Sequence, residues 1–270
     1  MIKKIRAKIN SFKKRFKWHK EMVAVKKLIK SSKTVVDTNI CFKNLLILAP
    51  HSDDEWIGCS SLLIDETSNC IVCSMDMDGG NNALEKEKRF CEMQQLSKIF
   101  KHHLIRLEND KTLELTRFIY EKQPDYIAVP FFTDWHPEHI ETMRCLKNSL
   151  GDYQCGILMY QVSCPIPISA VNCALATSKK QFKKKWNLFK QVYQTQKNIP
   201  WMRFAFLERA EGNYVGAYAA SVFCMVDSKS WKNMFNDLPT QSEIEEIKSK
   251  LNDIYSNFVF VNEIWLKKSH

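Results

Sequence analysis

The chain has 270 residues, 45% of them hydrophobic, with only 7 Gly and 8 Pro. These values suit one α/β domain with an extension, or two small domains, and exclude a disordered or fibrous protein. The formal net charge of +10 is uneven, because residues 1–32 carry 12 Lys and Arg against one Glu, whereas residues 33–270 are nearly neutral. The high net charge therefore describes one segment and excludes a generally basic body.

Residues 1–32 have the pattern of a basic amphipathic helix. Apolar side chains recur at spacings of three and four residues, and eight Lys and Arg cover the other sides. The apolar stripe consists of Ile2, Ile5, Ile9, Phe12 and Phe16. This pattern is typical of a helix on an anionic membrane surface. Two alternatives stay open: the stripe packs on the protein body, or the basic run binds nucleic acid. We expect no nucleic acid, because the body has no basic surplus.

A short apolar run ends in a polar cluster at residues 51–55. Leu45 to Ala49 read as a buried parallel strand, which runs through Pro50 into the letters H-S-D-D-E. Asp53 or Asp54 can cap the helix that follows, from Glu55 to about residue 65. Ligands of α/β sheets bind at the carboxyl ends of the strands, so this turn is a candidate site. The alternative is a solvated turn with a capping residue.

A second strand, at residues 124–130, also ends in a polar cluster that contains two histidines. Histidine is a common metal ligand that titrates near neutral pH. A zinc hydrolase needs three nitrogen or oxygen ligands and an open position for water. His51, one of Asp53 and Asp54, and one of His136 and His139 supply such a set. The remaining carboxylate and histidine stay free to transfer protons.

The rest of the chain alternates between expected strands and helices. Strands are expected at residues 69–75, 104–107, 157–162 and 256–262, and helices at residues 83–100, 111–121, 138–150, 179–196 and 240–254. Regular alternation predicts a parallel sheet with right-handed crossovers. We therefore expect an α/β fold, Rossmann-like and mostly parallel, with helices on both faces and the metal site at the carboxyl ends of the strands.

The two polar clusters resemble the signatures of a known family. H-S-D-D-E, followed some 80 residues later by D-W-H-P-E-H, is similar to A-H-P-D-D-E and H-P-D-H of the PIG-L (LmbE-like) N-acetylglucosaminyl deacetylases. The resemblance covers residues 40–225. The chain departs at Pro50, Ser52 and Glu138, where the family usually has Ala, Pro and Asp. None of these departures removes a ligand or the base.

The resemblance implies a role for each matching residue. His51, Asp54 and His139 would bind Zn²⁺ or another divalent transition metal, Asp53 would be the general base, and His136 would assist the oxyanion or the leaving amine. Arg89, in an R-x-x-E pattern after a D-G-type loop, would help to hold the substrate; the alternative is a surface ion pair. We also expect Asp134 or Glu138 to orient His136 from behind.

The resemblance implies a zinc-dependent hydrolase, with residues 1–32 as an N-terminal helix and 33–270 as the deacetylase domain. It would remove the N-acetyl group from an N-acetylglucosamine-type sugar, nucleotide- or lipid-linked, in surface glycan biosynthesis. The alternatives are a non-catalytic metal- or glycan-binding protein of the same fold and a zinc hydrolase of another amide or ester. Ten scattered cysteines, no apolar span and no secretory signal predict a cytoplasmic protein, with the inner membrane face as its alternative location.

Overall fold

The computed structural model describes residues 2–38, 42–64, 69–77 and 82–268. The expected D-G-type loop at residues 77–82 falls largely outside this part of the chain, since residues 78–81 are not described. Ten α-helices are described: α1 Ile2–Ser32, α2 Asp54–Ile64, α3 Ala83–Phe100, α4 Lys111–Lys122, α5 Pro137–Ser149, α6 Lys179–Val192, α7 Trp201–Glu211, α8 Ser228–Asn233, α9 Gln241–Ser249 and α10 Ile254–Lys268. Seven strands are described: β1 Asn44–Ala49, β2 Asn69–Ser74, β3 His103–Arg106, β4 Tyr126–Pro130, β5 Gly156–Tyr160, β6 Cys173–Thr177 and β7 Ala219–Asp227.

All seven strands form one sheet in the order β3-β2-β1-β4-β5-β7-β6. The first five strands in this order are parallel, and β7 runs antiparallel to both β5 and β6. This confirms the mostly parallel α/β fold. The chain order reverses between β1 and β4, so their carboxyl ends diverge into loops on either side of a crevice. Both polar clusters of the sequence follow these two strands.

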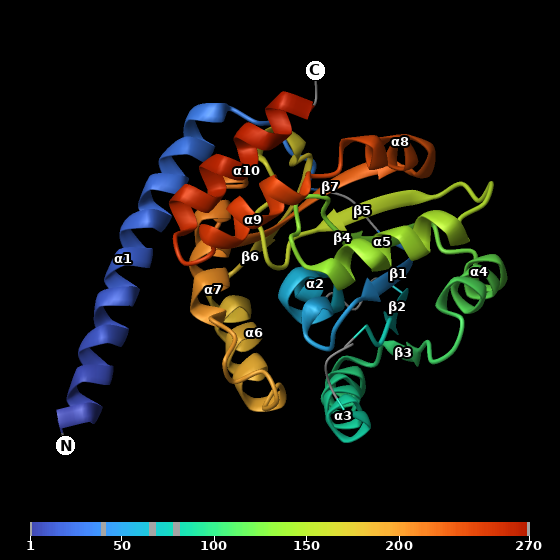
Figure 1. Ribbon diagram of the computed structural model, residues 1–270, viewed down its shortest axis with the longest axis horizontal. Helices are drawn as coiled ribbons and strands as arrows, with labels where there is room; N and C mark the ends of the chain where they lie inside the picture. The colour runs from blue at the N-terminus through green and yellow to red at the C-terminus, as the bar shows by residue number, and fades with distance from the viewer. Residues whose placement is uncertain (1, 39–41, 65–68, 78–81, 269–270) are drawn as a thin grey trace.

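Alternating side chains of the strands feed two separate cores. Leu46 and Leu48 of β1 pack with α4, α5 and α8, whereas Leu45 and Ile47 pack with α2, α3 and α6. This two-sided burial explains why the strands read as continuous apolar runs. Helices therefore cover both faces of the sheet, as the sequence predicted (Figure 1).

The second half of α1 packs on the body, while its first half extends away from it (Figure 1). Trp18, Met22, Val25 and Ile29 are buried against side chains of α7 and α10. Glu21 of α1 accepts a hydrogen bond from the first backbone N–H of α10, at 2.8 Å. The expected domain boundary at residue 32 stays a prediction. The buried residues of α1, which precede this boundary, form a third hydrophobic core together with α7 and α10.

The expected strand at 256–262 is wrong, because these residues lie inside helix α10. Phe258, Val261 and Ile264 recur every three residues and are all buried, which is helical burial. A short apolar run rich in aromatic and β-branched residues cannot be assigned by periodicity alone. Helix α7 and strands β6 and β7 were not predicted either.

None of the described helices combines the length and the apolar character needed to cross a bilayer. Nine cysteines of the described part of the chain are free thiols. Cys70 and Cys73, the only C-x-x-C pair, enter the cores on opposite faces of the sheet, as strand alternation requires.

Candidate metal centre and active site

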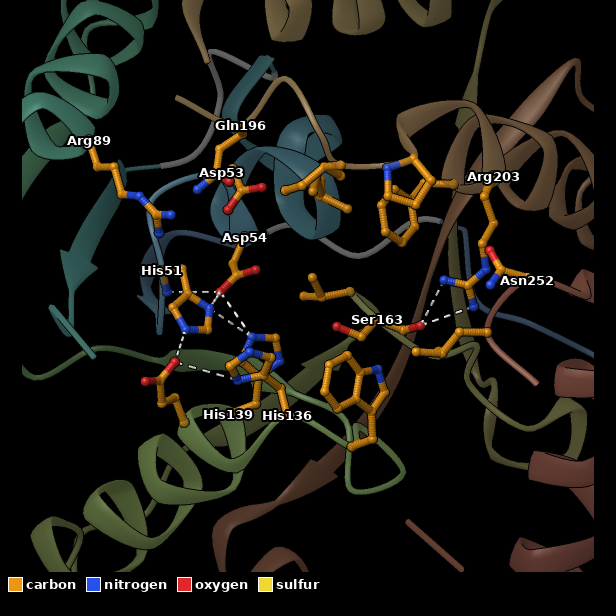
Figure 2. Close-up of a pocket in the computed structure, with 18 residues that line it drawn as sticks. His51, Asp53, Asp54, Arg89, His136, His139, Ser163, Gln196, Arg203 and Asn252 are labelled. Carbon is orange, nitrogen blue, oxygen red and sulfur yellow. Dashed lines mark hydrogen bonds and ion pairs between the residues drawn. The ribbon is translucent and has the colours of Figure 1, made fainter. Parts of the chain in front are cut away.

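The carboxyl ends of β1 and β4 open into a pocket of about 520 Å³ (Figure 2). The sequence-predicted residues His51, Asp53, Asp54, Arg89, His136, Glu138 and His139 all line it. Asp134 lies immediately behind them, 2% exposed. The tertiary structure therefore brings together residues that are up to 88 positions apart in the sequence.

A tight turn places the first cluster. Asp53 has a φ of 133°, a region that side chains other than glycine rarely adopt. Its carbonyl starts helix α2 by accepting the N–H groups of Trp56 and Ile57, at 3.0 and 2.8 Å. Its own N–H donates to Glu55 Oε2 at 3.0 Å. The strained backbone is thus held at both ends, a condition under which such strain persists at functional sites.

Helix α2 can approach the sheet closely because residue 58 is glycine. A Cβ atom at Gly58 would lie 2.2 Å from the ring of Tyr160 on β5. The Tyr160 hydroxyl in turn donates to the carbonyl of Leu48 at 2.6 Å, which fixes the end of β1. The start of α2, and with it Asp54, is therefore set against the carboxyl ends of β1 and β4.

Three potential ligand atoms converge at one point of this pocket (Figure 2). His51 Nδ1 lies 3.2 Å from Asp54 Oδ2 and 3.1 Å from His139 Nε2, and His139 Nε2 lies 3.2 Å from Asp54 Oδ2. Asp54 and His139 are buried, and the His51 side chain is only 12% exposed. A nearly equilateral triangle of nitrogen and oxygen acceptors is the arrangement that a cation requires.

The triangle fits a zinc-class ion. Zn²⁺ with ligands at about 2.0–2.2 Å in tetrahedral geometry separates neighbouring ligand atoms by about 3.3–3.6 Å. The observed 3.1–3.2 Å edges are close to that separation. His136 offers a further nitrogen, since one ring nitrogen of each of His51, His136 and His139 falls within 4.8 Å of the others. We favour Asp54 as the third ligand, because its Oδ2 lies 3.2 Å from both other atoms.

Carboxylates support two of these imidazoles from behind. Asp134 lies 3.0 Å from His139 Nδ1 and also accepts the N–H groups of His136 and Ser163, at 3.1 and 3.0 Å. Glu138 contacts His51 Nε2 at hydrogen-bond distance and lies 3.5 Å from His136 Nδ1. Metal-binding imidazoles commonly rest on such carboxylates. The expected supporting residues are present, but their nearest imidazoles are His139 and His51 rather than His136.

The surroundings of Asp54 and His139 favour the charged form of both side chains. Burial opposes the charge of Asp54 and His139, yet their mutual attraction, with Asp134, overrides it. The pKa of Asp54 is therefore held well below its usual range, and the pKa of His139 is raised well above its usual range. Two carboxylates around one imidazole favour a positive charge at this position. A bound cation would provide that charge without the proton.

Asp53, the residue before Asp54, also lines the pocket. It is 2% exposed, and Oδ2 has no hydrogen-bond partner within the described part of the chain. Burial, followed by the charges of Asp54 and Glu55, raises the pKa of Asp53 well above its usual value. A buried carboxyl group that lines the pocket beside the triangle is a candidate to exchange a proton with water.

The His136 ring packs across the other side of the cluster. Its centroid lies 4.6 Å from that of His51 and 5.0 Å from that of His139. Burial and then the two neighbouring imidazoles lower the pKa of His136. The ring therefore enters the pocket in its neutral form, and we expect it to act as a hydrogen-bond donor rather than as a permanent cation.

Two arginines lie on opposite sides of the pocket (Figure 2). Arg89 projects from α3 on the side of Asp53, whose carboxyl group it favours in the charged form. Arg203 projects from α7, is 5% exposed, and donates from both terminal nitrogens to the carbonyl of Ser163 at 3.1 Å. A ligand in the pocket would meet the His51–Asp54–His139 triangle between these two guanidinium groups.

Several lining residues were not assigned from the sequence. They are Trp135, Ser163, Gln196, Arg203 and Asn252. Arg203 and the pair Thr195-Gln196 lie within residues 40–225, the stretch that the family resemblance covers, but outside both motifs. Thr195, Gln196 and Arg203 lie far from both motifs in the sequence, so no local pattern points to them. Gln196 and Arg203 reach the pocket only because the segment after β5 folds back towards it.

The segment after α6 supports the site from one side. Tyr193 donates a short hydrogen bond to Glu55 Oε1, and Thr195 donates from its hydroxyl and its N–H to Glu92 of α3. Burial raises the pKa of Glu55 to about 7. Gln196 then enters the pocket. The segment Tyr193–Gln196 thereby connects the start of α2 to the helix that carries Arg89.

No family model matches the chain, and no curated protein matches it. Similar folds exist among solved structures. The conserved protein TT1542 from Thermus thermophilus has 20% sequence identity and a TM-score of 0.52, with 67% of this chain and 93% of that chain covered. A teicoplanin-pathway deacetylase triple mutant has 13% identity and a TM-score of 0.49, with 69% and 99% covered. The A40926 pseudoaglycone deacetylase has 12% identity and a TM-score of 0.48, with 68% and 97% covered. At these identities the likeness to TT1542 shows a shared α/β fold and nothing further.

Proposed function

We propose that the protein is a zinc-dependent N-deacetylase of the PIG-L (LmbE-like) type. The observation that carries the proposal is the triangle of His51, Asp54 and His139, with Asp53 in the same pocket. Asp53 Oδ2 has no hydrogen-bond partner in the described part of the chain. The two sequence motifs that contain these residues support the same family. Proteins of similar fold include enzymes named as deacetylases, but their distant likeness adds no weight to the proposal.

The proposed reaction is hydrolysis of an acetamide. When bound, zinc lowers the pKa of a coordinated water to about 7 and polarises a carbonyl group. Asp53 would accept the proton of the attacking water; its side chain lines the pocket, and its Oδ2 has no hydrogen-bond partner in the described part of the chain. His136, which also lines the pocket, would donate a hydrogen bond to the oxyanion, and Asp53 would pass the proton taken from water to the leaving amine.

The substrate class follows from the resemblance and the pocket. We propose an N-acetylated amino sugar of the N-acetylglucosamine type, carried by a nucleotide or a lipid, in the synthesis of a surface glycan. Arg89 and Arg203 flank the cluster, and guanidinium groups recognise phosphate oxygens in pairs. Arg89, on one side of the pocket, therefore favours an anionic carrier at that end of the sugar.

The test combines metal content with product release. The purified protein should contain about one zinc-class ion per chain, and it should release acetate from at least one member of a panel of N-acetylglucosamine conjugates. Bound metal and bound glycan without acetate would indicate the non-catalytic alternative. Acid or alcohol release from other amides or esters, without reaction of the sugars, would indicate a different hydrolase of the same fold.

A further inference from the structure

Residues 9–17, in the first half of α1, expose large apolar side chains. Every residue from 9 to 17 is exposed. Phe12 is 71% exposed, Phe16 55% and Ile9 49%, which is unusual for three side chains on one helix face. The helix extends away from the body at this end (Figure 1). Nothing in the described part of the chain covers this surface.

The exposed stripe and the buried stripe lie on nearly opposite sides of α1. A helix turns by about 100° per residue, so the mean direction of Ile9, Phe12 and Phe16 differs by about 140° from that of the buried side chains. The buried stripe consists of Trp18, Met22, Val25 and Ile29. The body cannot cover the first stripe while it holds the second. The two halves of one helix therefore serve different surfaces.

The positive charge of the segment indicates which kind of surface would cover the exposed stripe. Lys13, Lys14, Arg15 and Lys17 lie beside the stripe and are all exposed. Residues 1–32 carry 12 Lys and Arg against one Glu. A second copy of α1 would bring two such helices together, and like charges at close range repel. An anionic lipid surface attracts the same charges and accepts the apolar stripe between them.

We propose that residues 2–17 form an interfacial helix that binds the protein to an anionic bilayer. The aromatic rings of Phe12 and Phe16 would lie at the boundary between headgroups and acyl chains, with the lysines among the headgroups. The stems of long basic side chains can lie along the apolar layer while their charges stay in water. This inference concerns an interaction surface and does not depend on the proposed reaction.

The helix leaves the body beside the mouth of the candidate active site. Lys17 Nζ and Trp18 Nε1 both donate to the carbonyl of Asn252, at 3.4 Å, and Lys17 also pairs with Asp253 at 3.3 Å. Asn252 lines the pocket. A bilayer that holds the first half of α1 would therefore lie near the rim of the pocket.

Vesicle binding by the full chain tests this proposal. We expect co-sedimentation with phosphatidylcholine vesicles that contain phosphatidylglycerol, little binding to pure phosphatidylcholine, and release as salt rises towards about 0.5 M. The double substitution Phe12→Ser with Phe16→Ser should weaken binding to the anionic vesicles at least about tenfold, because it removes the apolar part of the interaction. The matched control is Val35→Ser, which removes a 91% exposed apolar side chain outside the helix.

Three outcomes would overturn the proposal. They are no binding of the full chain to anionic vesicles at low salt, equal binding to neutral vesicles, and undiminished binding of the double variant. Light scattering tests whether a second copy of the chain covers the stripe instead of lipid. A full chain that is a dimer and a double variant that is a monomer would mean that it does. An unchanged thermal transition will show that the variant is folded, since both side chains are exposed.

Discussion

Two clusters of buried charge flank helix α2, and they differ in how their charges are matched. On one side, Lys185 and Glu208 form a close ion pair at 3% and 8% side-chain exposure. Lys185 also donates to the carbonyl of Ile57 at 2.6 Å, and Trp186 donates to the second oxygen of Glu208 at 2.9 Å. Each charge there has a partner of the opposite kind.

On the other side, acceptors converge on one another. His51 Nδ1, Asp54 Oδ2 and His139 Nε2 meet at 3.1–3.2 Å, and Asp53 Oδ2 beside them has no described partner. Both clusters bear the large free-energy cost of removing charge from water. Burial alone therefore does not identify a functional site. Ligand-type atoms that face a common point at the edge of a pocket favour one, because a bound cation can replace the proton that His139 shares with Asp54.

The largest effect is expected when the triangle is broken. His139→Ala removes a buried ligand atom, so bound metal should fall from about one ion per chain to a small fraction, and acetate release should disappear with it. Elemental analysis after dialysis measures the loss, and His103→Ala, at an exposed position on β3, is the matched control. Full metal content in both His139→Ala and His51→Ala would exclude this ligand set.

The next effect separates the base from the ligand within one turn. Asp53→Asn should keep its metal and lose about two to four decades of kcat, the usual weight of general acid–base catalysis. Asp54→Asn should lose metal instead. Metal analysis and steady-state kinetics on both variants measure the difference. The reverse pattern would mean that the two carboxylates exchange roles, and Asp152→Asn in an exposed turn controls for a general loss of charge.

A substitution in the Lys185–Glu208 ion pair should change the stability of the protein and leave its metal content unchanged. Lys185→Met leaves Glu208 as an unpaired buried charge, which costs about 3–5 kcal/mol in the free energy of unfolding. Denaturant unfolding at neutral pH measures this change, while metal content in the native protein should stay at about one ion per chain. Loss of metal at unchanged stability would show that the two clusters are not independent.

The smallest effect concerns the support of the strained turn. Tyr193→Phe removes the hydroxyl that donates to Glu55 and leaves a buried carboxyl oxygen unsatisfied, which costs about 1–3 kcal/mol in stability. We expect a decrease in kcat of about tenfold, unchanged KM and full metal content, because Glu55 holds the backbone of Asp53. Tyr120→Phe, at a half-exposed ring on α4, is the control. A raised KM with unchanged kcat would contradict a positioning role.

The sequence was sufficient for the parts of the fold with strong local patterns. Apolar runs that end in polar turns identified β1 and β4, and alternation of strands and helices identified the parallel half of the sheet. It failed at residues 256–262, where the apolar run belongs to α10, and it did not find β6, β7 or α7. The secondary structure of these segments depends on the elements they pack against, and a local sequence pattern carries no information about those contacts.

The N-terminal segment shows the same division within a single helix. Its helical period and its charge were readable from spacing and composition. Which residues face the body was not, because both stripes have helical spacing and similar apolar character. The structure buries Trp18, Met22, Val25 and Ile29 and leaves Ile9, Phe12 and Phe16 exposed.

For the site, the sequence by itself determined the residue types and the strand ends on which they lie. Both H-S-D-D-E and D-W-H-P-E-H follow buried strands, so local order alone placed His51, Asp54 and His139 at the same edge of the sheet. Only the tertiary structure decided the rest: β1 and β4 became neighbours, Asp134 came to support His139, and Arg203 entered the pocket from α7. The physical reason is that strand order and long-range packing come from the burial of whole faces, and these bring together side chains with no relation in sequence.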